Sequence, residues 1–382
     1  MNFYRGIPVQ NDAVELSTSQ QKRHQIFDWI TLFGLNSAIV LTGCASSVRS
    51  IQTIQQTTSV TPSSLGIPNS IGTLGSYEFV SVQGIGEIFT YSIKDRKQVL
   101  VDPVYRTPCS DPSGMVITNI TGNNVMAVVC YDTGTLLTLD IHADGSLSAL
   151  GLVSGLDAPY PGIALDGTNV FIPLFGGSAV NGGVAKVNIA SPGNPVITGV
   201  ATLASPSPGG YAHPGYLTVH GGYIFLSAGS ESDPLSTSST IQVVDEAKME
   251  LVGIPFPVAH SPQQLAVQGT TAYVTMFDAA QLESIDVSSP RNLRSLQVLP
   301  LATAPTCHAE PIVVRNSLAY VGCYVEGTID EVDISNPSNM QLTRNIPGIA
   351  DPQRLQSAGN YLLVTSSTNG GNFYQIDVGS SK

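Results

Sequence analysis

The sequence predicts an all-β protein, a seven-bladed β-propeller with four-stranded antiparallel blades. Charged residues make up only 12% of the chain, whereas Gly (37) and Pro (25) are abundant, and this composition favours short strands joined by turns. A short proline motif followed by two alternating segments recurs seven times, at intervals of 41 to 53 residues. Each unit holds four segments with a period of two, and four short strands per unit is typical of a propeller blade.

Residues 1–43 predict a lipoprotein signal peptide. Trp29–Gly43 is an uncharged run of fifteen residues, short for a transmembrane helix and typical of the apolar part of a signal peptide. Residues 41–44, Leu-Thr-Gly-Cys, resemble the lipobox of bacterial lipoproteins. The resemblance implies that Cys44 is lipidated and anchors an exported protein to the outer membrane or cell surface. The alternative is a buried N-terminal helix that ends in a free cysteine.

Residues 44–64 are rich in Ser, Thr and Gln, which predicts a tether. The propeller itself is expected over residues 65–382, but its last unit stops at Lys382 after only three strands. A ring must close without leaving a sheet edge exposed. We therefore expect residues 50–57 to supply the outer strand of the last blade; the alternative is a three-stranded last blade.

The seven units begin at one proline each, which is tolerated at the first residue of an inner strand because that residue need not donate to the ladder. The anchors are Pro68, Pro112, Pro161, Pro214, Pro262, Pro311 and Pro352. In four units the third segment contains a related pattern: VNIASP from Val187, IDVSSP from Ile285, VDISNP from Val332 and IDVGSS from Ile376. This pattern resembles the LVIVD repeat of bacterial propellers and, more widely, the YncE and lactonase class of seven-bladed propellers. The resemblance implies a fold and no particular reaction.

Four cysteines besides Cys44 occupy matching places in two units. Cys109 and Cys307 lie just before an inner strand, and Cys130 and Cys323 lie near the end of the strand that follows. In an antiparallel pair, the start of one strand lies opposite the end of the next. Of the three possible connectivities, we therefore expect disulfides Cys109–Cys130 and Cys307–Cys323, in an oxidising compartment.

Polar residues beside the anchoring prolines are expected to ring the mouth of the central channel. They are Asp111, Tyr160, His213, His260, His308, Glu310 and Asp351. One hypothesis is a divalent metal held by His213, His260, His308 and Glu310, or acid–base catalysis by a histidine with Glu310. The other is that these residues cap strand starts in a wet channel. Loops between second and third strands open on the same face, and Tyr131, Tyr160, Tyr211 and Tyr324 are candidates for stacking on a ligand.

The net charge of −12 argues against a nucleic-acid partner, because phosphate binding needs a basic face. The sequence thus predicts a monomeric, lipid-anchored propeller outside the cytoplasm. We expect a binding or scaffold module for a protein or small-molecule ligand on the loop face. The alternative is a lactonase-like hydrolase, with a metal or a His/Glu pair at the channel mouth. The sequence leaves catalysis undecided and favours the non-enzymatic hypothesis.

Overall fold

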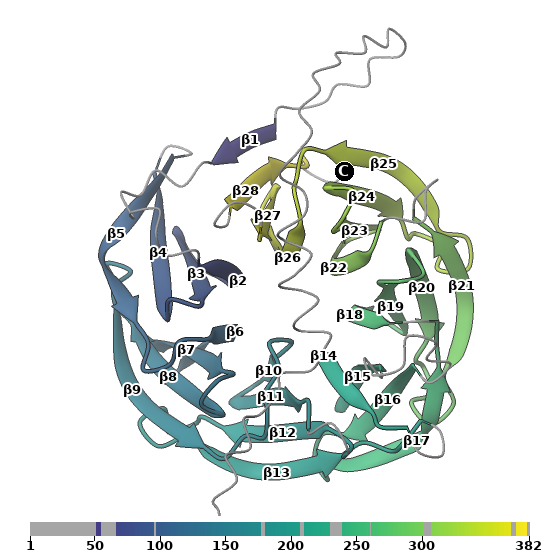
Figure 1. Ribbon diagram of the computed structural model, residues 1–382, viewed down its shortest axis with the longest axis horizontal. Helices are drawn as coiled ribbons and strands as arrows, with labels where there is room; N and C mark the ends of the chain where they lie inside the picture. The colour runs from purple at the N-terminus through teal and green to yellow at the C-terminus, as the bar shows by residue number, and fades with distance from the viewer. Residues whose placement is uncertain are drawn as a thin grey trace, which may run out of the picture. The chain divides into compact units, whose positions relative to one another are not determined.

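The protein is described here by a computed structural model that covers residues 51–54, 66–94, 97–176, 180–206, 210–229, 239–259, 261–301, 307–367 and 372–379. The described residues belong to one compact unit, Arg49–Lys382. They form seven four-stranded antiparallel sheets arranged in a ring, which confirms the predicted seven-bladed propeller (Figure 1). The described part of the chain contains no helix that is long and apolar enough to cross a membrane. The predicted signal peptide and Cys44 lie outside the described residues.

Blades 1 to 4 follow one another along the chain. Blade 1 consists of β2 (Ile67–Leu74), β3 (Tyr77–Gln83), β4 (Glu87–Lys94) and β5 (Lys97–Arg106). Blade 2 consists of β6 (Pro112–Ile120), β7 (Asn123–Cys130), β8 (Thr135–Ile141) and β9 (Leu147–Ser154). Blade 3 consists of β10 (Ala164–Asp166), β11 (Asn169–Leu174), β12 (Gly183–Asn188) and β13 (Val196–Thr202). Blade 4 consists of β14 (His213–His220), β15 (Tyr223–Gly229), β16 (Thr240–Asp245) and β17 (Glu250–Pro257).

Blades 5 to 7 complete the ring. Blade 5 consists of β18 (Pro262–Gln268), β19 (Thr271–Met276), β20 (Gln281–Asp286) and β21 (Arg294–Pro300). Blade 6 consists of β22 (Ala309–Arg315), β23 (Leu318–Cys323), β24 (Thr328–Asp333) and β25 (Gln341–Pro347). Blade 7 consists of β26 (Pro352–Ala358), β27 (Tyr361–Ser366), β28 (Asn372–Asp377) and β1 (Ile51–Ile54).

The N-terminal strand closes the ring as predicted. β1 pairs antiparallel with β28, with Ile51 opposite Ile376 and Ile54 opposite Phe373. The pairing covers the edge of β28 that the three C-terminal strands would otherwise leave open. Blade 7 therefore joins the two ends of the propeller chain in one sheet (Figure 1).

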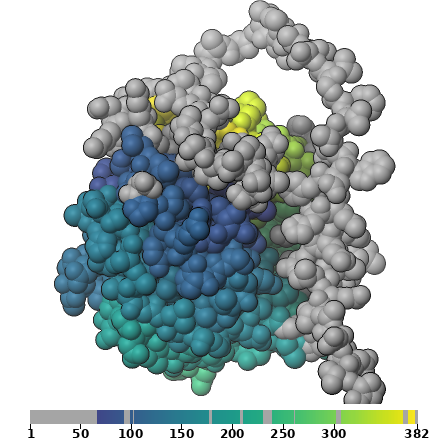
Figure 2. Space-filling model, turned by 60° about the vertical axis from the view of Figure 1, so that its left-hand side comes forward, coloured from purple at the N-terminus to yellow at the C-terminus, as the bar shows by residue number. Residues whose placement is uncertain are grey.

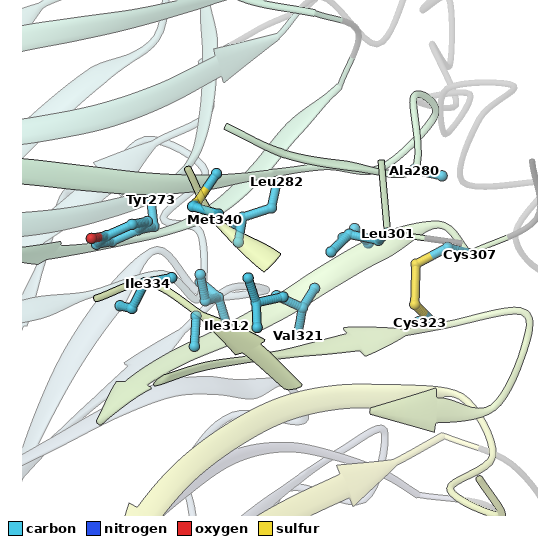
Figure 3. Packing of buried hydrophobic residues seen from close by; sticks show 13 residues of the cluster. Tyr273, Ala280, Leu282, Leu301, Cys307, Ile312, Val321, Cys323, Ile334 and Met340 are labelled. Atoms are coloured by element: carbon cyan, nitrogen blue, oxygen red, sulfur yellow. A yellow bond between two sulfur atoms is a disulfide. The ribbon is translucent and has the colours of Figure 1, made fainter. Parts of the chain in front are cut away.

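The core is divided among the interfaces between blades. A cluster between blades 5 and 6, for example, packs Leu282 of β20 against Ile312 and Val321 of β22 and β23 (Figure 3). Middle strands lie between two neighbouring sheets, so they are buried along their whole length; all six residues of β19 are buried. Outer strands such as β13 alternate between exposed and less exposed residues and form the rim seen from the side in Figure 2.

Blade 3 departs from the expected start of an inner strand. β6, β18 and β26 begin at their prolines, but β10 begins three residues after Pro161. Gly162 instead forms a bridge with Tyr216 of blade 4, and the amide of Leu217 donates to its carbonyl at 3.2 Å. A Cβ at position 162 would lie 2.5 Å from Tyr216 Cα, so this contact requires glycine. The segment around Pro161 therefore pairs with two blades, since Pro159 forms a bridge with Leu174 of β11 and Gly162 forms one with Tyr216.

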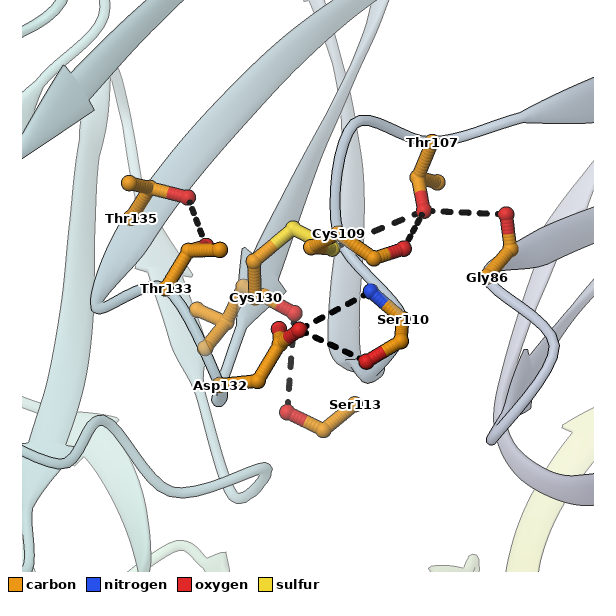
Figure 4. The surroundings of a disulfide bond; sticks show 10 residues. Gly86, Thr107, Cys109, Ser110, Ser113, Cys130, Asp132, Thr133 and Thr135 are labelled. Atoms are coloured by element: carbon orange, nitrogen blue, oxygen red, sulfur yellow. Dashed lines mark hydrogen bonds between the residues drawn. A yellow bond between two sulfur atoms is a disulfide. The ribbon is translucent and has the colours of Figure 1, made fainter.

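Both predicted disulfides are present. Cys109 and Cys130 are bonded with their Cα atoms 6.0 Å apart, and Cys307 and Cys323 are bonded with theirs 4.5 Å apart. Around the first disulfide, Asp132 accepts hydrogen bonds from the amide and hydroxyl of Ser110, at 2.9 and 2.7 Å (Figure 4). Two disulfides indicate a location outside the reducing cytoplasm.

Candidate functional site at the channel mouth

In every blade the inner strand begins on the face where the second strand ends. Pro68 is opposite Val82 in blade 1, and Pro112 is opposite Cys130 in blade 2. We call this side the mouth face. The candidates Asp111, Tyr160, His213, His308, Glu310 and Asp351 lie on it, at or just before the starts of inner strands. His260 lies outside the described residues.

The backbone is irregular at this face. In six blades the ladder between the first two strands shifts register close to the anchoring proline, as between Pro352 and Arg354. Such bulges redirect side chains near functional sites. Ser261, His308 and Asp351, which lie before the inner strands of blades 5, 6 and 7, also have φ values of 53°, 46° and 41°. Non-glycine residues with positive φ are costly and cluster at functional sites, so the mouth is a candidate site on backbone grounds alone.

A buried guanidinium joins four blades across the channel. Arg354 of β26 donates through Nη2 to Asn69 Oδ1 at 3.0 Å, and through Nη1 to Tyr216 Oη at 3.0 Å and Gln353 O at 2.7 Å. Arg354 Nη1 lies 3.7 Å from Glu310 Oε1, and the two side chains are only 14% and 9% exposed. The guanidinium also lies 5.1 Å from the centre of the Tyr216 ring, within the range of a cation–π contact.

The same network continues to blade 2. Asn69 Nδ2 donates to Gln83 Oε1 at 3.0 Å, and Gln83 Nε2 donates to Asp111 Oδ2 at 2.9 Å. Asp111 Oδ1 is buried and accepts no hydrogen bond from the described residues. Burial raises the pKa of Asp111 to about 6; the nearby charge of Asp132 adds to the rise and the Gln83 hydrogen bond opposes it. Asp111 therefore titrates near the physiological range.

Aromatic rings from blades 2 to 6 line the mouth. We call them the aromatic arc: Tyr131, Tyr160, Phe175, Tyr211, His213, Tyr216, Phe277, His308 and Tyr324. Phe175 stacks on His213 at 4.6 Å between ring centres, and Phe277 stacks on His308 at the same distance. Tyr160 meets Tyr216 edge-on at 6.3 Å, so the arc contacts the Arg354 network. Most of these rings are half-buried and thus keep a solvent-facing part.

Four rings of the arc come from one repeated position, the first residue after the second strand of a blade. They are Tyr131, Phe175, Phe277 and Tyr324. The amide of each donates to a carbonyl just before the inner strand of the same blade, for example Tyr131 to Asp111 at 3.0 Å and Phe277 to Ser261 at 2.9 Å. Tyr131 and Tyr324 were predicted from the sequence, whereas Phe277 and Arg354 were not. Phe277 could have been found by comparing this position across the repeats.

The two described histidines of the predicted metal set lie in ring stacks. His213 Nδ1 is 2.8 Å from the carbonyl of Phe175, which can only accept, so Nδ1 carries the proton and Nε2 is the acceptor in the neutral ring. Glu310 contacts Tyr216 and Arg354. Among the described residues, three side chains bring possible metal-ligand atoms close enough to hold one ion: Cys307, Cys323 and Asp330. Both of these sulfurs are already joined in a disulfide. His213, His308 and Glu310 thus form no such group, and the metal remains a prediction because His260 is not described.

A cavity of about 360 Å³ lies in the channel, between the inner strands of blades 7, 1, 2 and 3. Its lining includes Ser70, Thr73, Met115, Ile117, Leu165, Arg354 and Gln356. Gln356 Nε2 donates to Thr73 Oγ1 at 3.1 Å, while Gln356 Oε1 is buried and accepts no hydrogen bond from the described residues. This volume is in the range of small-molecule sites.

Comparisons with known proteins agree with the fold. Residues 308–346, which span most of blade 6, match the LVIVD repeat family. A comparison of the sequence with curated proteins finds no match. Among solved structures, hydrazine synthase of Kuenenia stuttgartiensis is similar with a TM-score of 0.65 and 13% identity, over 85% of this chain and 99% of that one.

Two further similar structures are bacterial. The periplasmic gluconolactonase PpgL of Pseudomonas aeruginosa has a TM-score of 0.60 and 16% identity, over 82% of this chain and 96% of that one. BamB of Moraxella catarrhalis has a TM-score of 0.54 and 12% identity, over 81% of this chain and 84% of that one. At these identities the similarity establishes the propeller fold, and the chain is a seven-bladed propeller in which residues 308–346 match the LVIVD repeat.

Proposed function

We propose that this propeller is a binding or scaffold module outside the cytoplasm, with its ligand site at the channel mouth. The observation that carries the proposal is the aromatic arc, whose rings come from five blades and contact the Arg354 network through Tyr216. Aromatic side chains offer a large contact area and lose little conformational entropy on binding. The rings of the arc are already held by one another and by backbone hydrogen bonds, so little ordering would accompany binding.

The site is tested by ligand screening with matched tyrosine variants. Small molecules and short peptides are screened for those that raise the melting temperature of the wild-type protein, and hits are repeated with Tyr160→Leu and Tyr223→Leu. Tyr160 belongs to the arc, whereas Tyr223 is also half-buried but begins β15 on the opposite face. The proposal expects ligand stabilisation to be lost in Tyr160→Leu and kept in Tyr223→Leu. Equal loss in both variants, or hits unaffected by either, would contradict it.

We also propose that Cys44 carries a lipid anchor, on the strength of the lipobox-like residues 41–44. Both disulfides support export, since they form in oxidising compartments. Phase separation in detergent tests the anchor. The full chain should partition into the detergent phase, and the Cys44→Ala variant should remain in the aqueous phase. A variant that still enters the detergent phase would refute lipidation.

Hydrolysis of a lactone is the second candidate function. Its support is local: a neutral His213 would keep the lone pair of Nε2, and Asp111 has a raised pKa near the pH at which a general base works best. The similar gluconolactonase fold makes sugar lactones sensible first substrates. Turnover should then fall in a His213→Ala variant, and a stoichiometric metal lost in a His213→Ala/His308→Ala variant would support the metal-dependent form. No turnover with added divalent metals would argue against hydrolysis.

A further inference from the structure

Carboxylates outnumber basic groups on the mouth face. Those of the described residues are Glu87, Asp111, Asp132, Asp157, Asp278, Glu310, Glu326 and Asp351. The basic side chains described there are Arg106, which lies 3.2 Å from Glu87, and Arg354, which lies 3.7 Å from Glu310. Two guanidinium groups against eight carboxylates leave the mouth strongly negative. The opposite face includes Lys248, Arg291, Arg294 and Arg315 together with carboxylates such as Asp144, Asp245 and Asp286, so charge alone does not distinguish the two faces.

Negative charge and aromatic rings occur together at this mouth. The aromatic faces attract cations through their quadrupole, and a concave rim of one charge sign focuses its field on the opening. The arc itself supplies one such contact, because the Arg354 guanidinium lies over the Tyr216 ring.

We infer that the mouth face docks a basic peptide segment, whose Lys and Arg side chains lie against the aromatic arc. This inference rests on the proposed binding function and adds the chemistry of the partner. The arc extends over blades 2 to 6, and the carboxylates extend over blades 1, 2, 5, 6 and 7 together with the link between blades 2 and 3. A single small cation would contact one part of this surface, whereas an extended segment with several positive charges contacts many parts at once.

A matched pair of aspartates provides the test. Asp132 on the mouth face accepts from the amide and hydroxyl of Ser110 at 2.9 and 2.7 Å. Asp144, in the turn between β8 and β9 on the opposite face, accepts from the amide and hydroxyl of Ser146 at 3.0 and 2.6 Å. Asn keeps the acceptor oxygen at either position and removes the charge. Asp132→Asn and Asp144→Asn therefore change net charge equally and preserve both turns.

The probe is a short labelled peptide of alternating lysine and serine, and the readout is fluorescence anisotropy. We expect Asp132→Asn to weaken binding by about two- to fivefold, which is the effect of one exposed charge pair. We expect Asp144→Asn to bind as the wild type does, and affinity to fall as salt is raised. The matching peptide of glutamate and serine should not bind. Circular dichroism and melting temperature confirm that both variants are folded.

Several outcomes would overturn the inference. Equal weakening by the two substitutions would mean that only overall charge matters, and equal binding of the lysine and glutamate peptides would remove the charge preference. Spermine that binds as tightly as the lysine peptide would assign the site to a small polyamine. A neutral aromatic peptide that binds independently of salt and is lost in Tyr160→Leu would leave the proposed binding function standing and refute its cationic partner. Failure of all these probes would count against both.

Discussion

Replacing Asp111 by asparagine should stabilise the protein, although it removes a charged group from a hydrogen-bonded network. Asp111 accepts from Gln83 Nε2 at 2.9 Å, and the amide oxygen of asparagine can accept the same hydrogen bond. What the substitution removes is the cost of holding a carboxylate in a buried position with Asp132 nearby. That cost appears as a pKa of Asp111 raised from 3.8 to about 6.

The magnitude follows from the linkage between protonation and folding. Two pKa units correspond to about 3 kcal/mol of difference between the folded and unfolded chain. Between pH 3.8 and about 6 the folded protein keeps a proton that the unfolded chain has lost, so the free energy of unfolding falls as pH rises through this window. The penalty is absent below the window and complete above it. We therefore expect the free energy of unfolding of Asp111→Asn to exceed that of the wild type by about 3 kcal/mol at pH 7 and to differ little near pH 3.8.

Urea unfolding at the two pH values, with the disulfides intact, measures this difference. Asp333→Asn serves as a control of opposite sign, because hydrogen bonds from the amide and hydroxyl of Ser335 hold the pKa of Asp333 below its usual value. That variant should lose stability at pH 7 and keep most of the deficit near pH 3.8, because the deficit disappears only between pH 3.8 and the lowered pKa of Asp333. An Asp111→Asn protein that is less stable than wild type at pH 7, or one that differs equally at both pH values, would refute the reasoning.

Three further predictions concern the ring itself. Arg354→Leu removes the guanidinium beside Glu310, whose side chain is only 9% exposed, and should lower the free energy of unfolding in urea by about 3 kcal/mol. An Arg354→Leu/Glu310→Gln variant that is no more stable than the single variant would contradict this account. Cys109→Ser/Cys130→Ser opens a loop of 21 residues and should cost about 3 kcal/mol by the same assay, whereas an unchanged urea midpoint would contradict a stabilising role. Removal of residues 1–57 exposes the edge of β28, so light scattering should detect self-association; a purely monomeric truncated protein would show that the edge is protected in another way.

The architecture could be predicted because a propeller repeats its local signals. Each unit carries its own proline, turns and alternating strands, so seven weak signals support one another, and the closing strand follows from counting strands in the last unit. The disulfides followed from the same logic, since Cys109 and Cys307 occupy equivalent places in two blades.

The channel network could not be predicted in this way. Arg354 and Asn69 lie 285 residues apart in sequence, and Arg354 and Tyr216 lie 138 apart. No local pattern indicates which inner-strand side chains meet across the channel, because the register bulges after the prolines set their directions. The prediction that an inner strand begins at Pro161 is wrong for a similar reason. The bridge from Gly162 to Tyr216 joins two blades, and no pattern within one unit indicates it.

The pairing of β1 with β28 has a consequence for the order in which the molecule can be built. Ile376, the partner of Ile51, is synthesised after all strands of blades 1 to 6, so β1 can pair only once β28 has been made. Phe373 of β28 belongs, with Val80 and Leu363, to the apolar cluster that joins blade 7 to blade 1, so this cluster stays incomplete until then. A chain that is cut short before β28 cannot form this pairing, and its β1 strand is left without a partner strand.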